Sequence, residues 1–311
     1  MSRNRNQPGR WAEHEVTTDE AGRTVQEILV DSLRISRRMI QRLTRSDGIR
    51  LDRHAPHLQR KVRAGEVVSA RIGAAEESTL EPVEMPLEVV FEDADLLVVN
   101  KAPFLLVHPV APHHRATLAH GVTHHFLAQG LHARVRPVHR LDRDTSGLLL
   151  IAKSAYVHQI LDRQLRERTI QREYLALVGG EVQPEEGVVD APIGRTPRDP
   201  SLRAVMPRGE AARTRFRVVE RYAGATLVEL ELETGRTHQI RVHMAHLGYP
   251  LLGDVQYGGV TMTGLHRQAL HAGRLAFVHP ISGEPVDLEV PLPDDLARVR
   301  AELLARSGES A

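Results

Sequence analysis

Apolar residues recur along the chain with two spacings, and the spacings separate a small N-terminal part from a larger one. Intervals of three and four residues predict helices over 25–33 and 37–45. Ser36 directly precedes the second of these and fits the N-cap position. Short apolar runs at 48–51 and 66–72 predict strands. The first part is therefore expected to be a small α+β module.

The larger part alternates strand-like pairs with helix-like segments. Residues 87–101 predict two strands joined by a short acidic turn, and residues 214–235 and 274–290 predict two hairpins with glycine in their turns. Helical patterns fall between them, at 117–129, 154–168 and 237–247. Strand pairs joined by hairpins, with helices interspersed, predict an α+β domain with a mixed, largely antiparallel sheet and flanking helices.

Pattern and composition together predict how the chain divides into domains. We predict a disordered arm at 1–20, the small domain at 21–73, a linker at 74–86, the large domain at 87–295, and a helix end and tail at 296–311. The 311 residues include no cysteine, which excludes disulfides and thiolate zinc sites. The polar N-terminus and the lack of a long apolar run lead us to expect a soluble, cytoplasmic protein without membrane contact. We also expect a monomer.

The cations carry more information than the net charge of +1, because only three of the 41 basic residues are lysine. Arginine holds phosphate bidentately and stacks on bases. Arg38, Arg42 and Arg45 share one face of the predicted helix 37–45. This face is either an RNA contact or an ordinary solvated surface.

The stretch RPVHRLDRDTSGLLLIAK, residues 136–153, places Asp142 and Asp144 next to an apolar run. A single DTSG does not predict an aspartic protease, which needs two such loops. The doubly wound pattern of dehalogenase-type phosphotransferases is also missing. His120 and His124 have the spacing of zinc ligands, but no glutamate or thiolate accompanies them, so we expect no metal.

Five ordered elements resemble the RluA-type pseudouridine synthases, which isomerise uridine in ribosomal and transfer RNA. They are LLVVNKAPFLLVHP, HRLDRDTSG, REY at 172–174, TGRTHQIRVHMAHLGYPLLGDVQYG at 234–258, and ALHAGRLAF. Together they span roughly residues 87–295. Phe104 departs from the resemblance, since the family usually has glycine there.

The resemblance implies a pseudouridine synthase fold and assigns the chemistry. Asp142 would be the catalytic aspartate, Arg241 its salt-bridge partner, and Tyr174 a pocket residue that packs on the base and helps to remove the C5 proton. Leu270 would pack under the base, Arg140 would fill the gap left by the flipped nucleotide, and Arg236 would position the loop or a phosphate. Because the isomerisation exchanges no electrons or atoms with a carrier, it implies no cofactor.

The small module resembles the RNA-binding domain of ribosomal small-subunit protein four, through SRRMIQRL, GIRL and VRAGEVV. The usual Asn-Gly or Asp-Gly turn is replaced by DRHAPH, which leaves the hairpin geometry open. This order of modules favours large-subunit ribosomal RNA as the substrate, with transfer RNA as the alternative. A non-catalytic ribosome-assembly factor is the remaining possibility, although Asp142, Tyr174 and Arg241 are all present.

Overall fold

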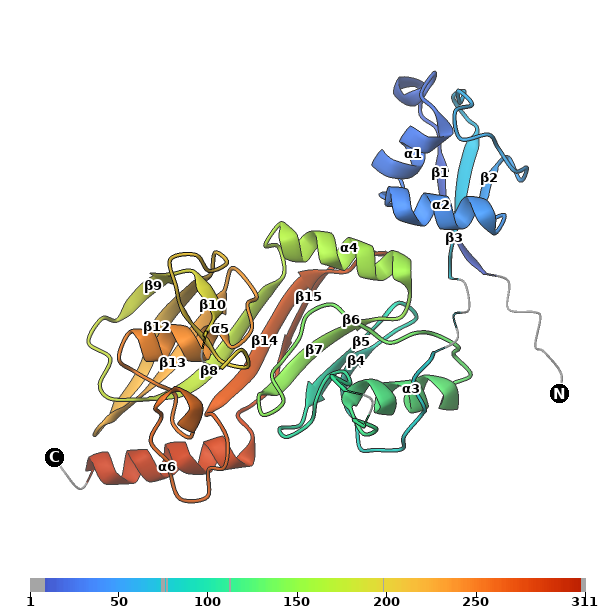
Figure 1. The fold of residues 1–311 in the computed structure, drawn as a ribbon. Helices are drawn as coiled ribbons and strands as arrows, with labels where there is room; N and C mark the ends of the chain where they lie inside the picture. Colours follow the sequence, from blue (N-terminus) through green and yellow to red (C-terminus); the bar gives the residue numbers. More distant parts are fainter. Residues whose placement is uncertain (1–8, 74–75, 77, 112, 198, 309–311) are drawn as a thin grey trace.

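The computed structural model describes residues 9–73, 76, 78–111, 113–197 and 199–308. The small module holds a three-stranded antiparallel sheet in the order β1 (Arg10–Glu15), β3 (Val67–Gly73), β2 (Ile49–Leu51). Helices α1 (Val25–Asp31) and α2 (Arg37–Arg45) pack beside it (Figure 1). As predicted, Ser36 caps α2, because its side chain accepts a hydrogen bond from the backbone N–H of Met39.

The predicted disordered arm is wrong for its described part. Residues 10–15 form β1, which pairs along β3, and Thr18–Glu20 form a 3₁₀ helix. Apolar and polar residues alternate only weakly in RWAEHE, so the local pattern does not predict a strand there. Pairing with β3 makes the segment a strand. The first eight residues of that prediction lie outside the described part.

The hairpin whose turn lacks Asn-Gly still forms. Leu51 and His54 exchange two backbone hydrogen bonds, of 2.8 and 3.0 Å, around Asp52 and Arg53. Both central residues have positive φ, 46° and 74°. This is the backbone that a two-residue hairpin needs and that glycine adopts most easily. Arg53 therefore occupies a glycine-like position.

The large domain is built on a ten-stranded sheet, and the fold class is as predicted. Its main order is β4-β5-β7-β14-β8-β13-β12-β9, with β15 beside β14 and β6 beside β7. The strands are β4 (Glu88–Glu92), β5 (Leu96–Lys101), β6 (Arg136–Pro137), β7 (Ser146–Ala152), β8 (Gln171–Gly179), β9 (Glu186–Asp190), β12 (Arg213–Tyr222), β13 (Ala225–Leu232), β14 (Leu270–Val278) and β15 (Pro285–Glu289). A separate pair, β10 (Ile193–Arg195) and β11 (Arg203–Val205), lies off this sheet. Each pair in the large sheet is antiparallel except β7 with β14.

The single parallel contact depends on a glycine. Gly147, at the start of β7, has a φ of 115°, and a Cβ there would lie 2.2 Å from the carbonyl oxygen of Ala272. No side chain fits in that space, so glycine lets β7 and β14 approach each other. The loop before β7, which carries Asp142, is thereby held against the centre of the sheet.

The helices cover both faces of the sheet. Alternate residues of β5 and β7 point to opposite sides, so one set packs with α4 (Ala155–Arg166) and the other with α3 (Leu118–Ala128). Helix α5 (Gln239–His246) joins the α3 side, and α6 (Asp294–Gly308) packs near β12 and β13. Figure 1 shows α3 and α4 near β7, and α5 and α6 near β12 and β13. No described helix is both long enough and apolar enough to cross a membrane.

Two predicted boundaries need correction. Residue 295 lies in the first turn of α6, so the domain boundary there cuts a helix whose Leu296, Val299 and Leu303 belong to the core. The acidic linker is also not free in its described part. Glu76 forms ion pairs with Arg42 and Arg136, which join it to both the small module and the large domain.

Candidate active site

Asp142 lies in the loop between β6 and β7, and its surroundings distinguish it from Asp144. Its side chain is 18% exposed, and Oδ2 lies 3.7 Å from Nη1 of Arg241 and 4.0 Å from Nε2 of His238. Asp144 instead accepts a 2.8 Å hydrogen bond from Nε of the exposed Arg143. Of the two carboxylates, Asp142 faces the nitrogen groups at the start of α5.

A cavity of about 740 Å³ opens beside Asp142, between its loop, β8 and the start of α5. The volume falls within the usual range for small-molecule sites. The structure brings the six large-domain residues selected from the sequence to its wall: Arg140, Asp142, Tyr174, Arg236, Arg241 and Leu270. They come from four segments of the chain, of which the first and last are more than 100 residues apart.

Arg241 is fixed mainly by a residue that the sequence analysis did not select. Its Nε and Nη2 donate to the two carboxylate oxygens of Asp254 at 2.6 and 2.7 Å, and Nη2 also donates to Gln256 at 2.7 Å. Burial alone would lower the pKa of Arg241, but the hydrogen bonds and charge of Asp254, with the charge of Asp142, raise it overall. The guanidinium therefore remains charged, with Nη1 left to face Asp142.

His238 is a second residue that was missed, although it lies within the matched stretch 234–258. Its φ of 57° is left-handed, an unusual conformation for a residue other than glycine. Nδ1 lies 2.8 Å from the hydroxyl of Tyr257, which itself accepts the backbone N–H of Arg203. The carboxylate of Asp142 accepts and does not donate, which favours the tautomer with the proton on Nε2 and with Nδ1 accepting from the Tyr257 hydroxyl. Burial lowers the pKa of His238 despite the nearby carboxylate, so the neutral ring predominates at pH 7.

Tyr174 and Leu270 form the apolar wall of the cavity. They belong to one core cluster on neighbouring strands, where Tyr174 pairs with Ala272 and Leu270 with Ala176. Burial raises the pKa of the Tyr174 phenol, and the charge of Asp142 adds to this while that of Arg172 opposes it. A phenolate is therefore disfavoured at neutral pH, so any proton acceptance by Tyr174 requires its own proton to leave in the same step.

The two arginines at the rim are held differently. Arg236 is exposed, and its Nε and Nη1 donate to the carbonyl of Ala211 at 3.0 Å and to Glu210 at 2.5 Å. Arg140 is also exposed, and no hydrogen bond or ion pair of its side chain is present among the described residues. Arg236 is thus fixed in place, whereas the guanidinium of Arg140 is available to a ligand.

The arginine face of α2 does not belong to this cavity. Arg38, Arg42 and Arg45 are exposed, while Met39, Ile40 and Leu43 are buried, as the spacing predicted. Arg42 pairs with Glu76 at 2.9 Å. The face is a surface of the small module, and its contact with RNA stays a prediction.

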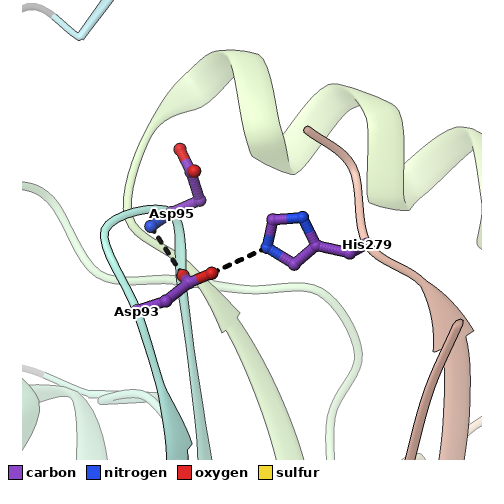
Figure 2. Close-up of side chains that lie close together, drawn as sticks. All are labelled: Asp93, Asp95 and His279. Carbon is purple, nitrogen blue, oxygen red and sulfur yellow. Dashed lines mark hydrogen bonds and ion pairs between the residues drawn. The ribbon is translucent and has the colours of Figure 1, made fainter. Parts of the chain in front are cut away.

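In the described part of the chain, the residues that could group around a metal do not include His120 or His124. Within the described part of the chain, the one group of sufficient size is Asp93, Asp95 and His279. Figure 2 shows Asp93 bonded to the backbone N–H of Asp95 and to Nε2 of His279, at 2.7 and 2.8 Å. Nδ1 of His279 accepts the N–H of Ser282, so Nε2 carries the proton, and Asp95 is paired with Arg10. These ligand atoms are already engaged in joining β4, β5, β14 and the small module.

The fold has counterparts among solved structures. The structure is similar to human RNA pseudouridylate synthase domain containing 1, with a TM-score of 0.55 and 27% identity, over 73% of this chain and 98% of that one. The family model for RNA pseudouridylate synthases matches residues 95–246, which include Asp142, Tyr174 and Arg241.

Relatives extend the match to nearly the whole chain. The uncharacterized RNA pseudouridine synthase YlyB of Bacillus subtilis is 41% identical over 276 residues, 88% of this chain and 91% of the relative. Ribosomal large subunit pseudouridine synthase D of Nitrosomonas europaea is 41% identical over 271 residues, 84% of this chain and 78% of the relative. The chain belongs to the RNA pseudouridylate synthase family and is an isomerase.

Proposed function

We propose that this pseudouridine synthase isomerises specific uridines of large-subunit ribosomal RNA. Five relatives that are 37–41% identical are named ribosomal large subunit pseudouridine synthase D, which supports this substrate over transfer RNA. The small module supports it as well, through its resemblance to the RNA-binding domain of ribosomal small-subunit protein four. We further propose that the protein acts in the cytoplasm as a monomer.

Asp142 is the catalytic carboxylate in this proposal. The observation that carries it is the position of Asp142, half-buried in the cavity wall and 3.7 Å from an arginine that Asp254 holds in place. A nearby cation favours the ionised form of a carboxylate. The reaction breaks the bond from the ribose to N1, turns the uracil and rejoins it through C5, so an ionised group beside the ribose is required as nucleophile or base. Atoms and electrons balance within the nucleotide, and no cofactor is needed.

The substrate base reaches Asp142 by leaving the RNA stack. Extruding a base costs a few kcal/mol, which contacts made elsewhere must offset. Tyr174 and Leu270 supply an apolar wall for the uracil, and Arg140 fills the vacated position in the RNA with its planar guanidinium. Arg236 holds the neighbouring loop or a phosphate. Arg38, Arg42 and Arg45 contact more distant phosphates.

The test is to delete the gene and map pseudouridines in ribosomal and transfer RNA. Loss of one or more sites in large-subunit RNA, restored by the wild-type gene and not by Asp142→Asn, is the expected result. Loss of pseudouridine sites in transfer RNA alone would mean that transfer RNA is the substrate, and the enzyme class would be unchanged. Restoration of the site or of ribosome assembly by Asp142→Asn would instead indicate that this carboxylate is not the catalytic one, or that the protein acts without catalysis.

A further inference from the structure

Arg172 differs from the other arginines buried in the described part of the chain. Three arginines are at most 7% exposed, namely Arg172, Arg241 and Arg267. Arg241 has a two-pronged contact with Asp254, and Arg267 has one with Asp295 at 2.6 and 2.9 Å. Among the described residues, Arg172 has no carboxylate partner. Its one side-chain hydrogen bond runs from Nη2 to the carbonyl of Leu232 at 3.2 Å, and its buried Nε has no acceptor.

A buried guanidinium without a counter-charge is costly, so a ligand that supplies acceptors is expected. Arg172 and Tyr174 are two residues apart on β8, so their side chains leave the same face of the sheet. Both line the cavity that Asp142 also lines. Arg172 therefore lies beside the proposed position of the uracil and not at the outer rim.

The neighbouring residues leave the charge of Arg172 available. His139 is buried nearby, and burial, with the charge of Arg172 added to it, lowers the pKa of that imidazole to about 3. His139 is therefore neutral and supplies no negative charge. Opposite the guanidinium, a Cβ on Gly235 would lie 3.3 Å from Nη1, so the missing side chain keeps the space beside that nitrogen open.

We infer that Arg172 donates hydrogen bonds to a carbonyl oxygen of the flipped uracil and stabilises the negative charge that the ring carries during the reaction. This inference rests on the proposed function. When the bond between N1 and the ribose breaks, its electron pair remains on the ring and is shared with the two carbonyl oxygens. The pair is used again when C5 bonds to the ribose. The proton then lost from C5 is balanced by the proton that N1 gains, so Arg172 gains and loses no proton. Donors that are already in place where such charge develops contribute strongly to catalysis.

A phosphate contact is the competing assignment, and the burial of Arg172 disfavours it. A phosphate would have to leave water and enter the buried part of the cavity beside β8, whereas Arg140 and Arg236 offer exposed guanidinium groups at the rim. The neutral, planar uracil fits the space next to Tyr174 at a lower desolvation cost. The experiment can separate the two contacts, because one responds to changes in the base and the other to changes in the backbone.

The substrate is an RNA fragment that carries the uridine whose modification disappears when the gene is deleted. Arg172→Gln keeps some polarity and removes the charge, and we expect its single-turnover rate at saturating RNA to fall roughly 100- to 1000-fold. RNA affinity should change less than about threefold, and Arg172→Lys should recover part of the rate because it restores the charge. Arg217→Gln is the control, since Arg217 is exposed, paired with Glu229 and outside the cavity.

Substrate analogues then identify the contacted atom. Fragments with 2-thiouridine or 4-thiouridine at the target replace one carbonyl oxygen with the weaker acceptor sulfur. One of them should slow the wild-type enzyme, and it should slow Arg172→Gln much less, because the contact is already lost. Purely additive effects for both analogues, coupling to a backbone phosphorothioate instead, or an unchanged rate in Arg172→Gln would each overturn the inference. Failure of the wild-type protein to convert any ribosomal RNA would refute the proposed substrate independently of Arg172.

Discussion

Two cations of the cavity, Arg236 and Arg241, are held by carboxylates, whereas two of α2, Arg38 and Arg45, have no ion pair among the described residues. In the cavity, Arg241 is buried and bonded to Asp254, and even Arg236 at the rim is tied to a carboxylate. On α2, Arg38 and Arg45 are exposed, with no ion pair inside the described part of the chain. A fixed cation can hold one carboxylate in one geometry, whereas a free one can follow a phosphate backbone of variable shape. The difference supports the proposed division of roles, with chemistry in the cavity and RNA capture on α2.

The two regions are nevertheless joined physically. A single cluster of buried apolar side chains runs from the small module to α4 and to one face of β5 and β7. The hydroxyl of Tyr156 donates to the carbonyl of Leu33, and Gln159 bonds to the backbone of Arg34 and Ser36. Removing the small module would expose this cluster to water. Point substitutions therefore test the comparison more cleanly than truncation does.

The largest effect is expected at Asp142. Asp142→Asn keeps the size and polarity of the side chain but removes the charge, so single-turnover pseudouridine formation should fall by roughly three orders of magnitude or more. Binding of RNA should be near normal. Asp144→Asn is the matched control, because Asp144 pairs with exposed Arg143 and does not line the cavity. An active Asp142→Asn together with an inactive Asp144→Asn would show that the wrong carboxylate was chosen.

The next prediction tests whether catalysis requires Arg241 to be held in a fixed geometry. Arg241→Met removes one partner of a buried ion pair with Asp254, which typically costs about 3–5 kcal/mol. We expect a rate at least roughly 100-fold lower and a reduced free energy of unfolding, measured by urea titration on the same sample. Asp254→Asn should lower the rate as well, although Arg241 still faces Asp142. A normal rate in Asp254→Asn would mean that Arg241 needs no fixed geometry.

The sequence predicted much of the fold, because its strongest local patterns coincide with its elements. The hairpin around Gly224 is formed by β12 and β13, and α2 begins after its predicted cap Ser36. The strand at Arg10–Glu15 was missed because its stability comes from pairing with β3, about 55 residues later in the chain. Local pattern contains no signal for such distant pairing.

The residues of the candidate site were selected through a resemblance to known enzymes, whereas the residues that hold them in place were not selected. Asp142, Tyr174 and Arg241 do line one cavity, but Asp254 and His238 were not selected even though they lie in a matched stretch. A list of motif residues does not show which of them bond to each other. Arg172 illustrates the same limit, since what distinguishes it is the lack of a carboxylate partner among the described residues, which no motif reveals.

A moderate effect on binding is expected from the arginine face of α2. Changing Arg38, Arg42 and Arg45 together to Ala should weaken RNA binding roughly tenfold or more. It should also lower the slope of log affinity against log salt concentration by up to about 2–3, because each phosphate contact contributes about 0.7–0.9 to that slope. The rate at saturating RNA should remain within about threefold of wild type, because phosphate contacts position RNA without breaking bonds. Filter binding between low and moderate salt measures the first effect.

The control for the arginine face removes the same charge elsewhere. Arg215, Arg217 and Arg221 lie on β12 and are paired with glutamates. Their replacement by Ala should leave the salt slope nearly unchanged. Equal salt slopes in the two triple variants would mean that the arginine face of α2 is only a solvated surface. A collapsed saturated rate in a folded α2 variant would mean that the small module helps to assemble the active site.

The smallest effect compares one strained residue in each region. Arg53 in the small module and Phe104 in the large domain have φ values of 74° and 64° at positions where glycine is usual. A left-handed residue other than glycine costs about 1–3 kcal/mol, part of which is lost again because glycine is more flexible when unfolded. Arg53→Gly and Phe104→Gly should each raise the free energy of unfolding by about 0.5–1 kcal/mol in urea titrations. Lys101 donates to three backbone carbonyls around the loop of Phe104, so that loop should keep its shape in the variant. Destabilisation by Phe104→Gly would mean that its exposed ring, and not the backbone, determines the stability of the loop.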